Sequence, residues 1–196
     1  MSLKYGVFLA RMQPVHNAHL LMVNKALKEC DKVLIVLGSE NKVDMLRNPF
    51  DITLREQLLR ESLSKKDNER IMIMTLPDWS MESDVDNAKI WGRYLYYNIV
   101  SRIGQKRFEL YYSDDQENLN LWFDDTEVKE YITYKLFNRN NMFDALSATK
   151  IRQAFISGDK EYVKKYCPPS VYARFTYLAS YYKNINKCPK EDFSMD

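Results

Sequence analysis

The sequence has few of the residues that build metal sites and disulfide frameworks. It contains two histidines and three cysteines. Cys30, Cys167 and Cys188 are odd in number and far apart, and no C-x-x-C pair is present, so neither a zinc knuckle nor a disulfide framework is indicated. We therefore expect reduced thiols and a cytoplasmic protein.

Long apolar runs and a strong net charge are also missing. No run approaches the roughly 18 apolar residues of a membrane span, and the first residues show no signal-peptide pattern. The 29 basic and 27 acidic residues leave a net charge of +2, which does not favour a bulk nucleic-acid or membrane binder. Any affinity for anions must come from local placement of cations.

What the sequence does contain is an alternation of short β-rich runs with helical patterns. Such alternation indicates right-handed βαβ crossovers. We predict a Rossmann-like α/β fold with a parallel five-stranded sheet, helices on both faces and a C-terminal helical segment. Helices are predicted over 17–29 and 84–103, and another after a capping box at Thr53 and Glu56. The predicted strands cover 4–10, 32–38, 70–77, 107–113 and 130–137.

The C-terminal part has clear helix boundaries. "SATKIRQAFISG" has an apolar face and ends in Gly158, a plausible C′ residue. Pro169 suits the first position of a last helix. With no repeats and no obvious linker, we predict a single domain over residues 1–184 and a frayed tail over 185–196.

Both histidines lie in one stretch, "LARMQPVHNAHLL", at the carboxyl end of the first predicted strand. His16 and His19 would occupy the first turn of a helix, where free N–H groups and the helix dipole attract anions. Arg11 adds a positive charge just upstream. Two surface histidines at an ordinary helix start are an alternative. A zinc site would lack its third ligand, so we assign no metal ligands.

A second anion-binding pattern occurs far along the chain, in "LSATKIRQAF". Ser147 and Thr149 can cap a helix, and Arg152 lies one turn further on the same side. Alone, this segment would be read as an ordinary capped helix. Together with the histidine stretch, it indicates two helix N-termini that form the two sides of one triphosphate site.

These motifs carry a family resemblance. "ARMQPVHNAH" resembles the HxGH motif of the nucleotidyltransferase superfamily, and "SATKIR" resembles its partner motif, S-x-T-x-x-R. With "GSENKVDMLRNPFDITLRE" between them, the chain is similar over about residues 5–177 to archaeal-type nicotinamide-mononucleotide (NMN) adenylyltransferases. The resemblance implies adenylyl transfer from ATP to NMN by direct in-line attack, giving NAD and pyrophosphate without a covalent enzyme intermediate. It also implies a possible homo-oligomer.

The same resemblance implies roles for individual residues. Mg²⁺ would be carried mainly by the ATP phosphates and water. The implied catalytic residues are His16, His19, Arg11 and Arg152. The implied ATP-binding residues are Gln13, Ser113, Ser147 and Thr149. The implied NMN-binding residues are Arg47, Asp78 and Asn87, with Trp79 and Trp91 as candidates to stack on the nicotinamide.

Three positions depart from the family pattern. Ala10 and Ala18 stand where the family has glycine, and Trp91 comes one residue later than the family's stacking tryptophan. One residue on a helix is about 100° of rotation, enough to turn a side chain away. Two alternatives therefore stay open: a nucleotidyltransferase with a different phosphate acceptor or CTP, and a nucleotide sensor without catalytic activity.

Overall fold

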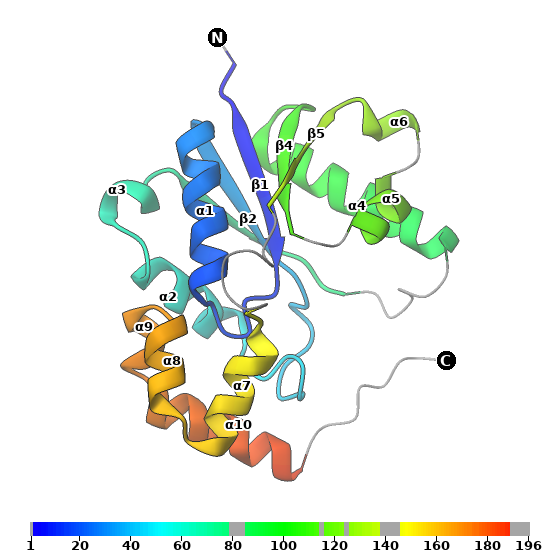
Figure 1. Cartoon of the computed structure of the whole chain (residues 1–196). Helices are drawn as coiled ribbons and strands as arrows, with labels where there is room; N and C mark the ends of the chain where they lie inside the picture. Colours follow the sequence, from blue (N-terminus) through cyan, green and yellow to red (C-terminus); the bar gives the residue numbers. More distant parts are fainter. Residues whose placement is uncertain (1, 79–84, 114–115, 124–125, 138–145, 189–196) are drawn as a thin grey trace.

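The computed structural model describes residues 2–78, 85–113, 116–123, 126–137 and 146–188, without the side chains of 85–87, 116–119 and 126. Within these residues, one parallel sheet lies between two groups of helices (Figure 1). The predicted Rossmann-like α/β class is confirmed. None of the described helices combines the length and the apolar composition that crossing a membrane requires.

The sheet contains the five predicted strands in the order β3-β2-β1-β4-β5. All neighbouring pairs are parallel. The chain winds from β1 to β3 on one side and then crosses to β4 and β5 on the other. The switch point therefore lies between β1 and β4, where open parallel sheets bind ligands. The strands are β1 Tyr5–Ala10, β2 Lys32–Leu37, β3 Ile71–Thr75, β4 Phe108–Tyr112 and β5 Ile132–Leu136.

Each face of the sheet has its own core, because successive side chains of a strand point to opposite faces. On β1, Phe8 belongs to the core under α1 and the C-terminal helices, and Val7 belongs to the core under α4, α5 and α6. The helices before β5 are α1 Asn17–Glu29, α2 Ile52–Glu61, α3 Lys65–Asn68, α4 Val85–Ile103, α5 Gln116–Phe123 and α6 Thr126–Lys129. Those after β5 are α7 Ala148–Ser157, α8 Lys160–Tyr166, α9 Pro169–Tyr172 and α10 Phe175–Lys187.

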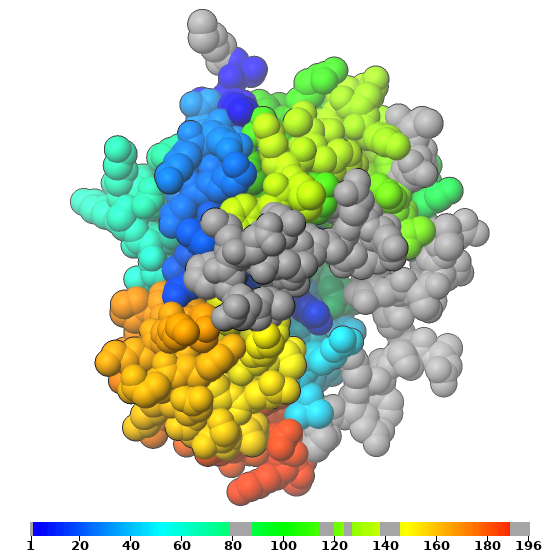
Figure 2. All heavy atoms as spheres, in the orientation of Figure 1, coloured from blue at the N-terminus to red at the C-terminus, as the bar shows by residue number. Residues whose placement is uncertain are grey.

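The four C-terminal helices gather into one lobe at the carboxyl edge of the sheet (Figure 2). Helix α7 has the predicted boundaries: the Ser147 side chain caps its start, and Gly158 ends it in a left-handed conformation with φ 78°. Ile151 and Phe155 of α7 are fully buried against the sheet core. This packing holds the N-terminus of α7 near the end of β1.

One predicted helix start is wrong. Helix α2 begins at Ile52, and its cap is Asp51, whose carboxylate accepts a hydrogen bond from the Leu54 N–H at 2.8 Å. The capping box expected at Thr53 is not used, because Asp51 already satisfies the first turn two residues earlier.

The predicted last helix is divided in two. Helix α9 begins with Pro169 as expected but ends at Tyr172, and α10 follows from Phe175. The break lets α9 pack on α2, where the Ser170 hydroxyl donates to the Leu58 carbonyl at 2.9 Å, while α10 packs on α7. Helix α10 runs to Lys187, inside the predicted tail, and residues 189–196 lie outside the described part.

Candidate active site

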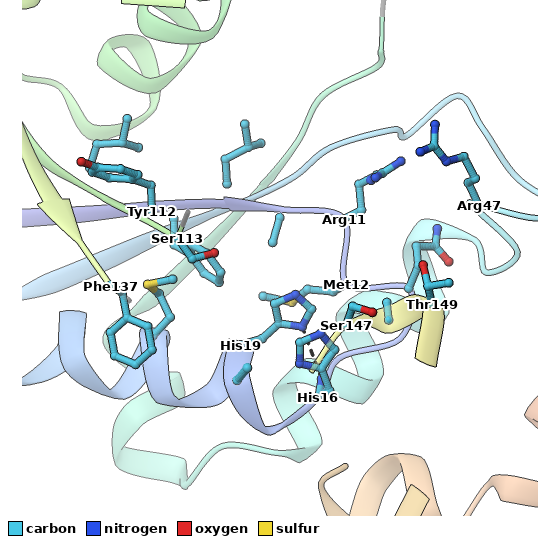
Figure 3. Close-up of a pocket in the computed structure, with 18 of the residues that line it drawn as sticks. Arg11, Met12, His16, His19, Arg47, Tyr112, Ser113, Phe137, Ser147 and Thr149 are labelled. Atoms are coloured by element: carbon cyan, nitrogen blue, oxygen red, sulfur yellow. Dashed lines mark hydrogen bonds between the residues drawn. The ribbon is translucent and has the colours of Figure 1, made fainter. Parts of the chain in front are cut away.

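A cavity of about 480 Å³ opens at the carboxyl ends of β1 and β4, at the switch point of the sheet (Figure 3). Its described lining contains arginines, histidines, hydroxyls and apolar groups but no carboxylate. A lining of this kind suits an anionic ligand. It brings together nine residues predicted from the sequence, which are Arg11, Gln13, His16, His19, Arg47, Ser113, Ser147, Thr149 and Arg152.

The two histidines form a stacked pair at the start of α1. Their ring centroids are 3.7 Å apart and the ring planes differ by 19°. His16 is the N-cap residue and is 2% exposed. Its backbone N–H donates to Nδ1 of His19 at 3.3 Å. Since a neutral imidazole that accepts at Nδ1 carries its proton on Nε2, His19 is set to donate from Nε2.

Helix α7 supplies a second N-terminus at the same cavity. Arg152 is 7% exposed. Its Nη1 donates to the Gln13 carbonyl at 2.8 Å, and its Nη2 donates to the Thr149 hydroxyl at 3.1 Å. Among the described residues, Nε of Arg152 has no hydrogen-bond partner. The predicted pairing of the two helix starts is therefore present, and Arg152 joins them.

Three arginines from three segments share the cavity. Arg11 follows β1, Arg47 lies in the loop between β2 and α2, and Arg152 lies on α7. Burial lowers the pKa of Arg152, hydrogen bonding with Tyr182 opposes this shift, and the charges of Arg11 and Arg47 lower the pKa further. An anion placed among the three side chains would relieve this repulsion.

Gln13 lines the cavity, but its amide is engaged elsewhere. Its Nε2 donates to the Phe50 carbonyl and its Oε1 accepts from the Phe50 N–H, both at 2.9 Å. Gln13 thus joins the loop after β1 to the loop after β2, and its carbonyl holds Arg152. Its contribution to an ATP site would be to shape the loop.

Asp78, predicted on the acceptor side, is absent from the cavity lining. Its carboxylate accepts from the Ser39 N–H at 3.2 Å and from the Ser39 hydroxyl. Its backbone pairs with the Asn41 side chain at 2.9 and 3.0 Å. Asp78 therefore supports the turn after β2.

The predicted stacking residues are placed differently from one another. Trp91 is half-buried on α4 and packs on Tyr94 and Trp122, at ring distances of 5.6 and 6.5 Å. It is absent from the cavity lining, although we predicted it as a candidate to stack on the nicotinamide. The one-residue displacement on α4 is a rotation large enough to account for this. Trp79 lies outside the described residues, and so does the side chain of Asn87.

Sequence reasoning missed Trp122, which lines the cavity from α5. Its position depends on a close approach of α4 and α5 at Gly92. A Cβ at Gly92 would lie 1.8 Å from the Trp122 carbonyl oxygen. The available signal was the glycine within the helical pattern of α4, since such a glycine often marks a close backbone contact.

Arg55 was missed as well, because its guanidinium is enclosed in the fold rather than exposed in the site. It is fully buried and donates to the carbonyls of Arg11 and Gly38 at 2.8 Å and to that of Ser39 at 3.2 Å. Burial lowers the pKa of Arg55 to about 10, and Asp51 and Asp78 oppose the shift. Arg55 stays charged at neutral pH and ties the loops after β1 and β2 together.

The apolar lining of the cavity comes from the cores on both faces of the sheet. In Figure 3, Tyr112 and Phe137 lie toward one end, and Arg11 and Arg47 lie toward the other. The residues from the α1 side are Phe8, Ala18, Met22 and Phe137. Those from the α4 side are Leu9, Leu95, Leu110, Tyr112 and Trp122. The cavity therefore combines apolar surface that can contact bases with arginines that can bind phosphates.

The described residues contain no group of three or more His, Cys, Asp or Glu side chains arranged to hold a metal ion. The polar side chains that line the cavity are arginines, histidines, hydroxyls and the Gln13 amide. The residues present therefore fit a divalent ion that arrives on phosphate oxygens and water, and do not provide a protein cage.

Comparison with known proteins agrees with this geometry. Residues 7–154 match the cytidylyltransferase-like family. The nicotinamide-nucleotide adenylyltransferase of Pyrobaculum aerophilum is 30% identical over 176 residues, which cover 87% of this chain and 86% of that protein. The enzyme of the same name from Thermococcus kodakarensis is 28% identical over 158 residues, covering 80% and 74%.

A solved structure shows the same fold. The bifunctional NMN adenylyltransferase/ADP ribose pyrophosphatase of Francisella tularensis, solved with AMP and a manganese ion, has a TM-score of 0.72 at 22% identity. The match covers 93% of this chain and 52% of that protein, so the chain spans about half of its length. From the family match and the relatives together, the chain belongs to the cytidylyltransferase-like family of nucleotidyltransferases, on the branch of the nicotinamide-nucleotide adenylyltransferases.

Proposed function

We propose that this protein transfers the adenylyl group of ATP to nicotinamide mononucleotide, giving NAD and pyrophosphate. The observation that carries the proposal is the cavity at the switch point of the sheet. Its donors His16, His19, Arg11 and Arg152 come from two helix N-termini and a strand end, and its described lining contains no carboxylate. The names of the relatives give the substrates their identity.

The proposed reaction needs positioning and charge stabilisation rather than a covalent catalyst. An ionised oxygen of the NMN phosphate attacks the α-phosphorus of ATP in line. A new P–O–P bond forms, the bond between the α-phosphorus and the bridging oxygen breaks, and pyrophosphate leaves with that oxygen. Since the attacking oxygen is already ionised, no general base is required. Donors and cations held in place lower the barrier.

The geometry supports a division of roles among the donors. The Nε2–H of His19 would stabilise charge on the α-phosphate, and the stacked His16 would hold its ring in place. Arg11, Thr149 and Arg152 would bind the β- and γ-phosphates and the leaving pyrophosphate. Arg47, exposed on the loop after β2, would bind the phosphate of NMN.

A divalent metal, which we take to be Mg²⁺, would enter on the ATP phosphates and neutralise part of their charge. The protein's own side chains would donate hydrogen bonds to the phosphate oxygens that the metal does not contact. Thr149 is exposed at the start of α7 and would remain available to them.

Trp122 is the aromatic side chain on the α4 side that we expect to contact the acceptor base. Base–aromatic stacking contributes about 1–3 kcal/mol, so Trp122→Ala should raise the KM for NMN by about five-fold or more while the KM for ATP changes little. Trp122→Phe should restore most of the affinity. Steady-state kinetics with each substrate varied would measure both constants.

Trp91→Leu is the matched control for Trp122, since Trp91 packs beside it without lining the cavity. Its KM for NMN should stay within about two-fold of wild type. A larger effect at Trp91 than at Trp122 would reverse the assignment of the stacking residue.

The experiment that tests the proposed function is pyrophosphate release from ATP or CTP across a panel of acceptors. NMN, nicotinic acid mononucleotide, pantetheine phosphate and riboflavin phosphate would be compared at equal concentration. We expect the highest kcat/KM with ATP and NMN. Turnover with another acceptor but not with NMN would overturn the assignment, and ATP binding without any turnover would indicate a nucleotide sensor.

A further inference from the structure

The C-terminal helix α10 lies outside the part of the chain that matches the family, residues 7–154, yet it contacts two segments of the site. It packs on α7, which carries Arg152, and on the loop between β2 and α2, which carries Arg47. Its contacts to that loop run through two consecutive tyrosines, Tyr181 and Tyr182.

Tyr182 touches both segments at once. Its hydroxyl donates to the Leu46 carbonyl at 3.3 Å, one residue before Arg47. Its ring faces Arg152, with the guanidinium carbon 5.9 Å from the ring centroid. Tyr182 is only 8% exposed. A single buried side chain therefore links the backbone beside one phosphate-binding cation to the side chain of another.

Neighbouring contacts connect the same segments a second time, so that the contacts form a closed ring through the structure. The Tyr181 hydroxyl donates to Asp44 at 2.5 Å, and its ring packs on Phe50 with centroids 6.0 Å apart. Phe50 exchanges two hydrogen bonds with Gln13, and the Gln13 carbonyl holds Arg152. This ring of contacts joins α10 to the loop after β2, that loop to the loop after β1, the loop after β1 to α7, and α7 to α10.

We propose that Tyr182 is a positioning residue that holds Arg47 and Arg152 in register, through its hydroxyl on the Arg47 loop and its ring on the Arg152 guanidinium. The proposal rests on the proposed function, in which Arg47 binds the NMN phosphate and Arg152 binds the ATP phosphates. It makes α10 part of the site, although no side chain of α10 lines the described cavity.

The physical reason lies in the exposure of Arg47. Its side chain is exposed and its loop has no regular secondary structure, so the loop must be anchored elsewhere for the cation to be preorganised. Arg152 is restrained by two hydrogen bonds on one side, and the Tyr182 ring limits its movement on another. If Tyr182 served only to pack α10, its aromatic ring would be sufficient and its hydroxyl would have no role.

Two variants separate the hydroxyl of Tyr182 from its ring. Tyr182→Phe removes the hydroxyl, with its bond to Leu46 and its interaction with Arg152, and keeps the ring on Arg152, whereas Tyr182→Leu removes both the hydroxyl and the ring. Tyr177→Phe is the matched control: Tyr177 lies on the same helix and is 55% exposed. Equilibrium dissociation constants for ATP and for NMN would be measured separately, each without the other substrate, alongside thermal unfolding.

For Tyr182→Phe we expect the Kd for NMN to rise about five-fold, as for loss of one hydrogen bond. The Kd for ATP should rise by no more than about two-fold, because the ring stays on Arg152. Tyr182→Leu should also raise the Kd for ATP, by about two-fold to five-fold. Tyr177→Phe should match wild type in both constants.

An unchanged Kd for NMN in Tyr182→Phe would overturn the proposal. The proposal would also be overturned if the Kd values for NMN and ATP rose together and the rise were explained by a smaller fraction of folded protein. If wild type binds both nucleotides but forms no NAD, the proposed function fails, while these dissociation constants still decide the role of Tyr182. If wild type does not bind NMN at all, both proposals fail.

Discussion

His19→Ala should lower kcat by roughly a hundred-fold or more, as for loss of a donor preorganised for the transition state. In the structure, the His16 N–H donates to Nδ1 of His19 at 3.3 Å, and a neutral imidazole that accepts at Nδ1 carries its proton on Nε2. The effect should fall mainly on kcat, because the proposed bond is strongest when charge develops on the α-phosphate. Steady-state turnover of ATP and NMN at saturation would measure it.

The control for His19→Ala must separate catalysis from capping. His19→Asn keeps a short amide that can accept the His16 N–H but cannot reproduce the imidazole donor at Nε2. We expect His19→Asn to retain the stability of wild type and to lose most of the turnover. Turnover near the wild-type level in a folded His19→Ala protein would remove His19 from the mechanism.

Arg55→Met should lower the free energy of unfolding by about 3–5 kcal/mol, as when one partner of a buried charged network is removed. The variant removes the fully buried guanidinium that donates to the carbonyls of Arg11, Gly38 and Ser39. Asp78 also loses a neighbouring positive charge. Urea denaturation followed by circular dichroism would give the difference in stability.

Arg60→Met is the matched control for Arg55→Met on the same helix. Arg60 pairs with Glu56 at 2.7 Å, and both side chains are partly exposed, at 40% and 38%. Such a surface pair contributes about 0–1 kcal/mol. Equal losses in the two variants would contradict the role assigned to Arg55. A folded Arg55→Met protein should also bind ATP more weakly, since Arg11 would lose its backbone anchor.

Much of the fold could be predicted because its signals are local. Apolar runs predicted the five strands, and helical spacing predicted α1 with its observed ends, Asn17 and Glu29. The errors have two different sources. At α2, two local signals competed, and Asp51 caps the helix ahead of Thr53. After Pro169, the chain divides into α9 and α10, and Ser170 of α9 contacts Leu58 of α2, which is distant in the sequence.

The candidate site was also visible in part. Helix N-termini with nearby cations are short sequence patterns, so His16, His19, Thr149 and Arg152 could be named in advance, and the structure brings them into one cavity. Their assigned roles in catalysis stay predictions.

The sequence alone determined the class of fold and the chemistry of an anion-binding centre, because both follow from periodicity and from motifs a few residues long. Only the tertiary structure decided that Trp122 rather than Trp91 lines the cavity, since that depends on the approach of α5 to Gly92. It also decided that Arg55 and Tyr182 hold the site loops. Such contacts join residues distant in the chain, and their energies arise from packing that no local pattern records.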